Sequence, residues 1–334
     1  MGVLKMLNHQ LMVSSSPHIR SKETVNGIML DVVIALMPAL IMGAWYFGIR
    51  ALVITAITVL SCVGAEYVWQ KRCGLPVTIN DWSAVVTGVL LAMNLPVTVP
   101  LWMPVVGGFF AIIIVKQVFG GIGQNFVNPA LAARAFLLTS WPVSMTRWVE
   151  PFTKLPIFSN VDILSAATPL DMIANTAEQV AVQPLPTYLH LFVGNIGGSI
   201  GETSAAALLL GGIYLLYKRI ISWRIPITFI GTVAVFSLIF GYQGLFTGDA
   251  LFQILSGGLM LGAFYMATDY ATSPVTPKGQ IVMGIGCGLI TSLIRIYGGY
   301  PEGVSYAILL MNIATPLIDR YTRPVKFGEV KSVA

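Results

Sequence analysis

One short run of the chain, Asp162-Ile-Leu-Ser-Ala-Ala-Thr-Pro-Leu170, places two hydroxyl groups and a carboxylate among small side chains. The alanines between Ser165 and Thr168 are small enough for another protein to approach the backbone. The order Thr168-Pro169-Leu170-Asp171 is also typical of a helix start, with threonine as the N-cap, proline at the first position and an acid at the third. On the residues alone, helix capping is the favoured role of Thr168, and covalent modification of its hydroxyl is the alternative.

The residues that usually hold metals or clusters are scattered along the chain. Cys62, Cys73 and Cys287 form no C-x-x-C pair, and the three histidines lie equally far apart. This spacing argues against an Fe–S cluster or zinc site built by this chain alone, and against a haem held by two histidines. A chain of this kind that carries electrons therefore needs an organic cofactor.

The composition indicates a protein embedded in a membrane. Of the 334 residues, 56% are hydrophobic and only 10% are charged, and the mean hydropathy is +0.79. A soluble domain typically contains about 25% charged residues. Since residues 1–22 lack an apolar h-region and a small-residue cleavage site, we expect no removable signal peptide.

Apolar runs predict an all-α polytopic fold with about ten transmembrane helices, some of them broken or re-entrant. Each crossing of a bilayer needs roughly 20 apolar residues, and several runs are shorter or interrupted by proline and glycine. The expected spans are Gly27–Phe47, Ala51–Trp69, Trp82–Leu95, Val99–Val115, Val127–Ser140, Leu191–Tyr217, Ile225–Tyr242, Leu251–Ala267, Ile281–Tyr297 and Val304–Ile318.

The distribution of Lys and Arg predicts the orientation of these spans. With ten crossings and a cytoplasmic N-terminus, fourteen of the nineteen basic residues fall on the cytoplasmic side, as the positive-inside rule requires. Both termini are then cytoplasmic, and the segment with Thr168 lies outside. The net charge of +5 is explained by these membrane-flanking residues, so we expect no nucleic-acid partner.

A weak internal repeat predicts two halves of five spans. Leu95-Pro-Val-Thr-Val-Pro100 and Ser273-Pro-Val-Thr-Pro277 occupy corresponding connections, although Pro-Val-Thr is also a common turn composition. Because five is odd, the second half would enter the membrane from the opposite face, as in inverted-repeat transporters. The expected organisation is a cytoplasmic segment 1–26, a first half 27–140, an outer loop 141–190, a second half 191–318 and a cytoplasmic tail 319–334.

Three motifs together carry a resemblance to a known family. Asp162-x-x-Ser165-Ala-Ala167-Thr168 resembles the D-x-x-[ST]-[GAS]-A-T flavinylation signature, and the runs 120–136 and 256–280 extend the similarity along nearly all of the chain. The chain resembles the RnfD family of the Rnf complex, which is related to the NqrB proteins of the sodium-pumping NADH:quinone oxidoreductase. The long N-terminal extension of the NqrB proteins is absent, which favours the Rnf branch.

This resemblance implies a function in a bacterial plasma (inner) membrane complex that passes electrons between ferredoxin and NAD and moves Na+ or H+. The chain would carry FMN, esterified through its phosphate to Thr168 by a flavin transferase on the outer face. The resemblance also allows a second, non-covalent flavin, riboflavin or FMN, within the spans. The implied partners are membrane lipid, the flavinylated G-type subunit, the membrane subunits A and E, and the Fe–S subunits B and C. The implied fold is similar to that of urea transporters.

Arg134 is a charge within a predicted span, where charges usually face a cavity or a partner. With the resemblance in view, it is a candidate to hold a flavin phosphate, and the alternative is an ion pair with a carboxylate from another span. Asn128, just before Pro129, is expected to supply an amide where the helix is broken. Asp162, Ser165 and Ala167 complete the candidate cofactor residues around Thr168.

The acids of the predicted spans are Asp31, Glu66 and Asp269, and any ion path needs some of them. Asp249 and Glu302 fall in outer loops, where we expect them to be solvated. The glycines of Gly284-x-Gly-x-Gly288 are expected to pack one helix closely against another. A solute channel of urea-transporter-like architecture without redox function is the alternative to the electron carrier, but a pure channel has no need for the Ser165 to Thr168 signature.

Overall fold

The computed structural model describes residues 24–153, 155–156, 166–177, 185–241, 244–298 and 302–324, and for residues 174–177 only the backbone. The described chain is mostly helical, which confirms the coarse prediction of a helical membrane protein. Its described strands, β1 (Phe240–Gly241) and β2 (Gly244–Leu245), form one small antiparallel hairpin in which Phe240 pairs with Leu245.

The first part of the chain folds into a run of helices of unequal length. They are α1 (Val25–Phe47), α2 (Ile49–Arg72), the 3-10 turn η1 (Ile79–Asp81), α3 (Ser83–Met93), α4 (Trp102–Phe109), the π-helical η2 (Phe110–Gln117), α5 (Pro129–Ser140) and α6 (Pro142–Met145).

The second part begins with the helix that follows Thr168 and ends near the C-terminus. Its elements are α7 (Pro169–Ala177), α8 (Tyr188–Val193), α9 (Ala205–Tyr217), α10 (Arg224–Ile239), α11 (Ala250–Leu255), α12 (Leu259–Leu261), the π-helical η3 (Gly262–Met266), α13 (Pro277–Tyr297) and α14 (Val304–Thr322).

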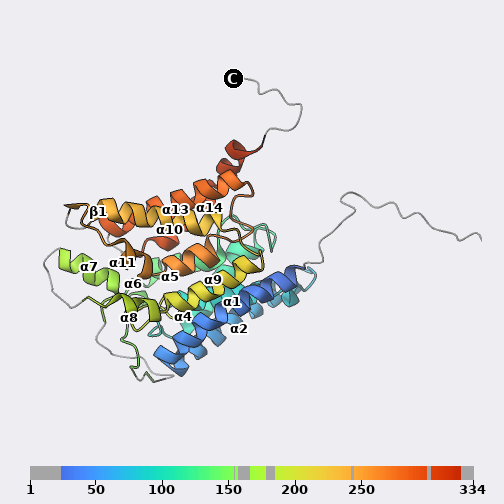
Figure 1. The fold of residues 1–334 in the computed structure, drawn as a ribbon. Coiled ribbons are helices and arrows are strands. Elements are labelled where there is room, and N and C mark those ends of the chain that lie inside the picture. Colours follow the sequence, from blue (N-terminus) through green and yellow to red (C-terminus); the bar gives the residue numbers. More distant parts are fainter. Residues whose placement is uncertain are drawn as a thin grey trace, which may run out of the picture.

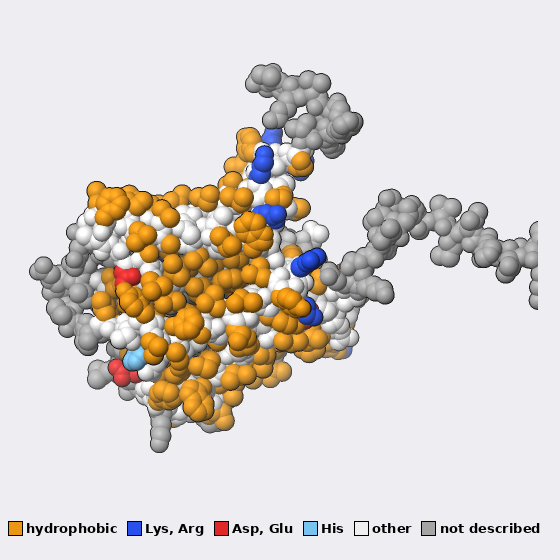
Figure 2. Space-filling view, viewed as in Figure 1, with side chains coloured by type: hydrophobic (Ala, Val, Ile, Leu, Met, Phe, Trp, Pro, Cys, Tyr) orange, Lys and Arg blue, Asp and Glu red, His pale blue; other side chains and the backbone are white. Residues whose placement is uncertain are grey.

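Three of the described helices, α1, α2 and α13, are long and apolar enough to cross a membrane by themselves. Large apolar side chains on their outer faces are exposed, such as Ile41 and Trp45 of α1 and Leu60 of α2. Such a surface needs an apolar solvent, and Figure 2 shows it as a broad hydrophobic region over the body. The full count of ten crossings, the inverted halves and the boundaries of the five segments stay predictions.

Two of the expected spans are broken in the structure. The run 191–217 is not one helix, because α8 ends at Gly194, whose φ of +108° is the left-handed conformation that terminates helices, and α9 begins at its N-cap Ser204. The run 251–267 is interrupted at residues 256–258, where Ser256 is extended and Gly257 has a φ of +65°. These two interruptions confirm the expectation that some of the spans are broken.

The core joins the two parts of the chain. Leu36 of α1, Leu91 of α3 and Leu131 of α5 belong to the same buried cluster as Leu208 of α9 and Phe229 of α10. Helix α1 packs against α9, and α5 packs against α14. In Figure 1, the start of α1 and the end of α14 lie at one end of the body, while α7, α8 and β1 lie at the opposite end.

Helices α10 and α13 pack closely because glycines of α13 face threonines of α10. A Cβ at Gly284 would lie 1.9 Å from Thr228 Oγ1, and one at Gly288 would lie 2.5 Å from Thr232 Cβ and 3.0 Å from the Phe229 carbonyl oxygen. The predicted close packing at these glycines is therefore confirmed.

We expect Gly288→Ala to push α13 away from α10 and to lower the free energy of unfolding by about 1–3 kcal/mol, the usual cost of overpacking. Thermal unfolding of the detergent-solubilised protein measures this. The matched control is Gly231→Ala on α10, where a Cβ meets nothing within 4 Å; this change removes a helix glycine and should be neutral or slightly stabilising. Equal stability of both variants would contradict the packing argument.

Candidate functional site

Thr168 caps α7 through a reciprocal set of hydrogen bonds. Its Oγ1 accepts from the Asp171 backbone N at 3.2 Å and donates to Asp171 Oδ2 at 2.7 Å, and the Thr168 backbone N donates to the same carboxylate at 3.3 Å. This arrangement is a capping box, and it confirms the helix start predicted from Thr168-Pro169-Leu170-Asp171.

Thr168 lies against the body of the protein and not on an open loop. The residue is only 5% exposed, and the next apolar side chain, Leu170, is 1% exposed. The preceding backbone is held as well, since Ala166 N donates to the Trp148 carbonyl oxygen at 3.0 Å. Ala167 is half-buried and lies close to Gly197. The other two residues predicted for this motif, Asp162 and Ser165, lie outside the described residues.

A cavity of about 10 Å³ lies directly beneath Thr168. That volume is close to the space that one water molecule needs. Three chain breaks supply most of its walls, namely the connection from α8 to α9, the interruption between α11 and α12, and the loop before α14. The lining residues are Thr168, Pro169, Leu170, Ile196, Gly197, Gly198, Glu202, Gly257 and Glu302.

Arg134 of α5 compensates part of the negative charge of the two glutamates that line this cavity. Its Nη2 pairs with Glu302 Oε2 and lies 3.7 Å from Glu202 Oε1, and its Nη1 donates to Ser305 Oγ. Arg134 is 5% exposed. Of the two alternatives from the sequence, the ion pair with carboxylates of other segments is thus the arrangement observed.

The expectation that Glu302 is solvated was wrong. Its side chain is only 15% exposed, because the loop before α14 folds inward over Arg134. Burial and the nearby Glu202 carboxylate raise the pKa of Glu302 to about 7, against the opposing effect of Arg134. Asp249, the other acid expected to be solvated, is exposed and accepts a hydrogen bond from Tyr188 at 2.6 Å.

Asn128 lies at a second, larger cavity. As the N-cap of α5 it accepts from Ala130 N and Leu131 N, and its Nδ2 donates to the Met266 carbonyl oxygen at 3.3 Å. The predicted amide support of broken backbone is therefore confirmed. This cavity, of about 350 Å³, lies between α1, α3, the turn before α5 and the segment after η3.

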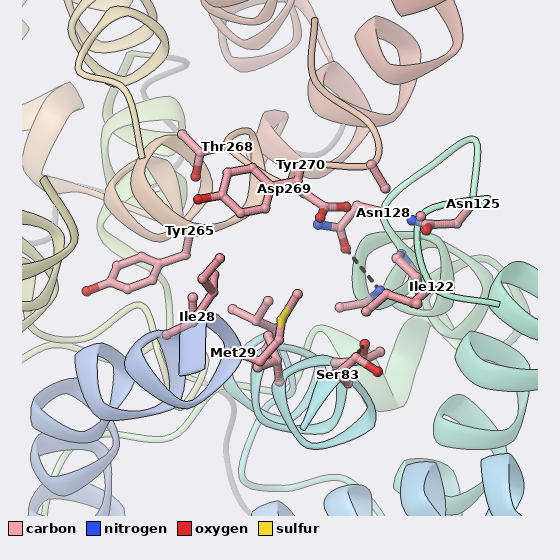
Figure 3. Close-up of a pocket in the computed structure, with 18 of the residues that line it drawn as sticks. Ile28, Met29, Ser83, Ile122, Asn125, Asn128, Tyr265, Thr268, Asp269 and Tyr270 are labelled. Carbon is pink, nitrogen blue, oxygen red and sulfur yellow. Dashed lines mark hydrogen bonds between the residues drawn. The ribbon is translucent and has the colours of Figure 1, made fainter. Parts of the chain in front are cut away.

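Figure 3 shows the polar groups of the larger cavity. Asn125, Asn128 and Asp269 gather on one side, and Ile28 and Met29 of α1 contribute an apolar wall. Asp269 Oδ2 accepts a hydrogen bond from Thr272 Oγ1 at 3.2 Å. An apolar pocket with a few converging polar groups is the common form of a ligand site.

A buried ion pair forms one edge of the same cavity. Lys116 of η2 lies 2.8 Å from Glu66 Oε1 of α2 and donates to Ser83 Oγ at 2.6 Å, and Gln117 Nε2 donates to the same Glu66 oxygen. Lys116 is one of the fourteen basic residues assigned to the cytoplasmic side from the sequence, but it is only 3% exposed. Asp31, the third acid of the spans, instead lies near the surface, where it accepts from Tyr214 and pairs with Lys218.

The four candidate residues that the structure describes are distributed over two sites. Thr168 lines the small cavity, with Ala167 next to it in the chain; Arg134 reaches this cavity through two carboxylates, and Asn128 lines the larger cavity. Sequence reasoning missed Glu202 altogether. Its signal was an acid within the otherwise apolar run 191–217, directly after a glycine-rich stretch.

Comparison with known proteins gives consistent matches over nearly the whole chain. The model of the "NQR2, RnfD, RnfE family" matches residues 12–328. The chain is 55% identical over 323 residues to the D-type subunit of the Na(+)-translocating ferredoxin:NAD(+) oxidoreductase complex of Acetobacterium woodii, covering 96% of each chain. It is 48% identical over 321 residues to the D-type subunit of the proton-translocating ferredoxin:NAD(+) oxidoreductase complex of Clostridium ljungdahlii, covering 95% of this chain and 96% of the relative. It is 39% identical over 343 residues to the D-type subunit of the ion-translocating oxidoreductase complex of Halorhodospira halophila, covering 95% of each.

We expect Arg134→Met to lower the free energy of unfolding by about 3–5 kcal/mol, because it leaves two buried carboxylates without their shared cation. Adding Glu302→Gln should restore part of this loss. The control is Lys218→Met, which breaks the exposed pair with Asp31 and should cost at most about 1 kcal/mol. Denaturant unfolding in detergent separates the variants, and equal losses from both single changes would contradict the stabilising role of Arg134.

Proposed function

The chain belongs to the NQR2, RnfD, RnfE family, and we propose that it is the flavin-bearing membrane subunit of an ion-translocating ferredoxin:NAD oxidoreductase. In this role it relays electrons through covalently bound FMN and couples their transfer to Na+ or H+ transport. The observation that carries the proposal is the similarity, over about 95% of the chain, to subunits named for such complexes. Alone, the chain is not a complete enzyme, because ferredoxin and NAD would bind to other subunits.

The attachment point for the FMN phosphate is Thr168. Its hydroxyl stands at the N-terminus of α7, where backbone N–H groups and the helix dipole favour a phosphate. As an ester, the Thr168 oxygen would still accept the hydrogen bond from Asp171 N, although it would no longer donate to the carboxylate. Bound FMN supplies the electron-carrying chemistry, and the protein supplies its position and its electrostatic surroundings.

The size of the small cavity restricts where an attached flavin can lie. A volume of about 10 Å³ has no room for an isoalloxazine ring. The ring would therefore extend from Thr168 away from the core, toward the surface of this chain or a neighbouring subunit. That direction suits an electron relay, because the ring stays accessible to donors and acceptors on other subunits.

The larger cavity is the candidate site for the second, non-covalent flavin. Its volume of about 350 Å³ is within the usual range of ligand pockets. Its apolar walls suit a ring system, while Asn125 and Asn128 offer amide groups to the polar edge of that ring. The Asn128 amide oxygen already accepts from two backbone N–H groups. Asn125 and Thr268 donate to the carbonyl oxygens of Val127 and Phe264, so their own oxygens keep the capacity to accept a hydrogen bond from a ligand.

The proposed location is the bacterial plasma membrane, with both termini cytoplasmic and Thr168 on the outer side. The start of α1 and the end of α14 lie opposite α7 (Figure 1), and Lys and Arg side chains gather near the termini in the face drawn in Figure 2. The positive-inside rule supports a cytoplasmic location for that end. A flavin transferase of the outer side would then reach Thr168, and the partners would be lipid, the flavinylated G-type subunit, membrane subunits A and E, and Fe–S subunits B and C.

An inverted-repeat, urea-transporter-like arrangement of the two halves is consistent with the packing. Helix α1, in the first span of the first half, contacts α9, in the first span of the second half. Likewise α5, in the last span of the first half, contacts α14, in the last span of the second half. Inverted halves can move against each other around a fixed site.

We expect the chain, co-expressed with a flavin transferase, to gain the mass of one FMN less one water, and Thr168→Val to abolish this gain. Thr168→Ser keeps a hydroxyl and a cap and should retain the adduct. Intact-mass analysis and in-gel flavin fluorescence measure both. The control Thr98→Val removes a half-buried hydroxyl elsewhere, one that donates to the Arg147 carbonyl oxygen, and should leave the adduct unchanged. A native chain without an adduct, despite an active transferase, would favour the channel alternative.

When the complex with the unsubstituted chain is denatured, we expect it to release one non-covalent flavin for each copy of this chain. We expect Val86→Trp to fill the larger cavity and so to prevent this flavin from binding. Val86 lines this cavity and is 9% exposed. Val143→Trp is the matched control, because Val143 is 63% exposed and far from the cavity in sequence. Retention of the Thr168 adduct reports that the Val86→Trp protein is folded. Equal release from both variants would exclude this cavity as the flavin site.

A further inference from the structure

The small cavity beneath Thr168 has more carboxylates than cations around it. Glu202 and Glu302 share the single guanidinium of Arg134. The next charged groups are Asp171 of α7, which acts on Glu302, and Arg295 of α13, which lies near Gly257. Including them gives three carboxylates and two guanidiniums. Among the residues that the structure describes, one negative charge is in excess on either count, and the side chains of Arg134, Glu202 and Glu302 are only 4–15% exposed.

The two carboxylates are also close to each other, because both approach the same atom, Arg134 Nη2. Glu202 Oε1 lies 3.7 Å from it, and Glu302 Oε2 is in direct contact. Glu202 Oε1 is buried and accepts no hydrogen bond from any described residue. A buried carboxylate oxygen that accepts no hydrogen bond is strongly unfavourable unless a proton or a cation neutralises it, and the cation near Glu202, Arg134, is shared with Glu302. Two neighbouring carboxylates commonly solve this by sharing one proton.

We propose that Glu202 and Glu302 together hold one exchangeable proton beneath Thr168, and that negative charge added at Thr168 makes them hold it more tightly. The first part needs only this chain. The second part rests on the proposed attachment of FMN, whose phosphoester supplies the charge.

The surroundings of the pair suit a proton better than a larger ion. The cavity that both acids line has room for about one water molecule, and Glu302 is the more exposed of the two, so water can deliver and remove the proton. The raised pKa of Glu302 agrees with exchange near neutral pH. Besides the charged groups already named, α14 places the Ser305 hydroxyl on Arg134 and Tyr306 near it, and neither supplies a compensating cation.

The position of the pair makes it responsive to chemistry at Thr168. Thr168, Glu202 and Glu302 line one cavity, so a phosphoester at Thr168 adds a negative charge to a site that already has one in excess. By linkage, a proton that binds more tightly to the charged site also stabilises that charge by the same free energy. Proton uptake at the outer end would thus accompany the appearance of negative charge, without any bond being made or broken except that to the proton.

Infrared difference spectroscopy of the full chain over pH 5 to 9 tests the proposal. We expect a protonated carboxylic acid band that disappears as the pH rises through neutrality, and that shifts in ²H₂O and with ¹³C-glutamate. The isotope label assigns the band to glutamate without any substitution. Glu302→Gln should remove the band, whereas Glu150→Gln, which changes an exposed acid, should leave it.

The flavin-dependent part is tested on the FMN-modified chain. Its band should disappear at a higher pH, corresponding to about tenfold tighter proton binding, whereas Thr168→Val co-expressed with the transferase should keep the midpoint of the unmodified chain. If no adduct forms, the proposed function fails while the band of the unmodified chain still tests the proton pair. Absence of a glutamic acid band near neutral pH, or its loss on adding Na+ at constant pH, would overturn the proton site.

Discussion

The burial of the Arg134 guanidinium is the constraint on which the end of this protein that carries α7 depends. A cation at 5% exposure must find anions, and it takes them from two distant segments, Glu202 before α9 and Glu302 before α14. Because an unpaired buried charge costs several kcal/mol, these segments have to close around α5. Their closure forms the floor on which Thr168 and the first turn of α7 lie.

The irregular segment between α8 and α9 is stabilised by hydrogen bonds to the end of another helix. Where the segment between α8 and α9 is irregular, Ile200 N donates to the Leu95 carbonyl oxygen at 3.1 Å and Gly201 N to that of Met93 at 2.8 Å. The end of α3 thus supplies the acceptors that a continuous helix would have found within itself. Irregular backbone in a largely apolar body is tolerated only where such partners exist. The same breaks carry the cavity-lining glycines and Glu202, so irregularity and the candidate site have a common origin.

Local features were predictable from the sequence, whereas pairings between distant residues were not. The helix start at Thr168 and the close packing at Gly284 follow from residue type and spacing alone. Broken helices were predicted, but the positions of the breaks after Val193 and at Ser256 were not, because average hydropathy over a window hides a few glycines in an apolar run. Glu302 was expected in solvent because nothing near it in sequence indicates that Arg134, 168 residues away, lies beside it. Glu202 had a local signal, an acid in an apolar stretch, but its partner was again remote.

The capping role of Thr168 and its proposed role as a flavin carrier place opposite demands on the same oxygen. Capping favours a buried hydroxyl bonded to Asp171, and the residue is indeed 5% exposed. Modification requires that oxygen to be reached by another protein, so α7 would have to leave the body while the ester forms. After the proposed reaction the oxygen could cap α7 again as an acceptor, but the phosphate would then lie close to Asp171 and to the excess negative charge below. The N-terminal dipole of α7 and Arg134 would oppose that repulsion only in part. The proton that we propose for Glu202 and Glu302 would remove the remainder, and the acid pair and the esterified threonine would then form one electrostatic unit.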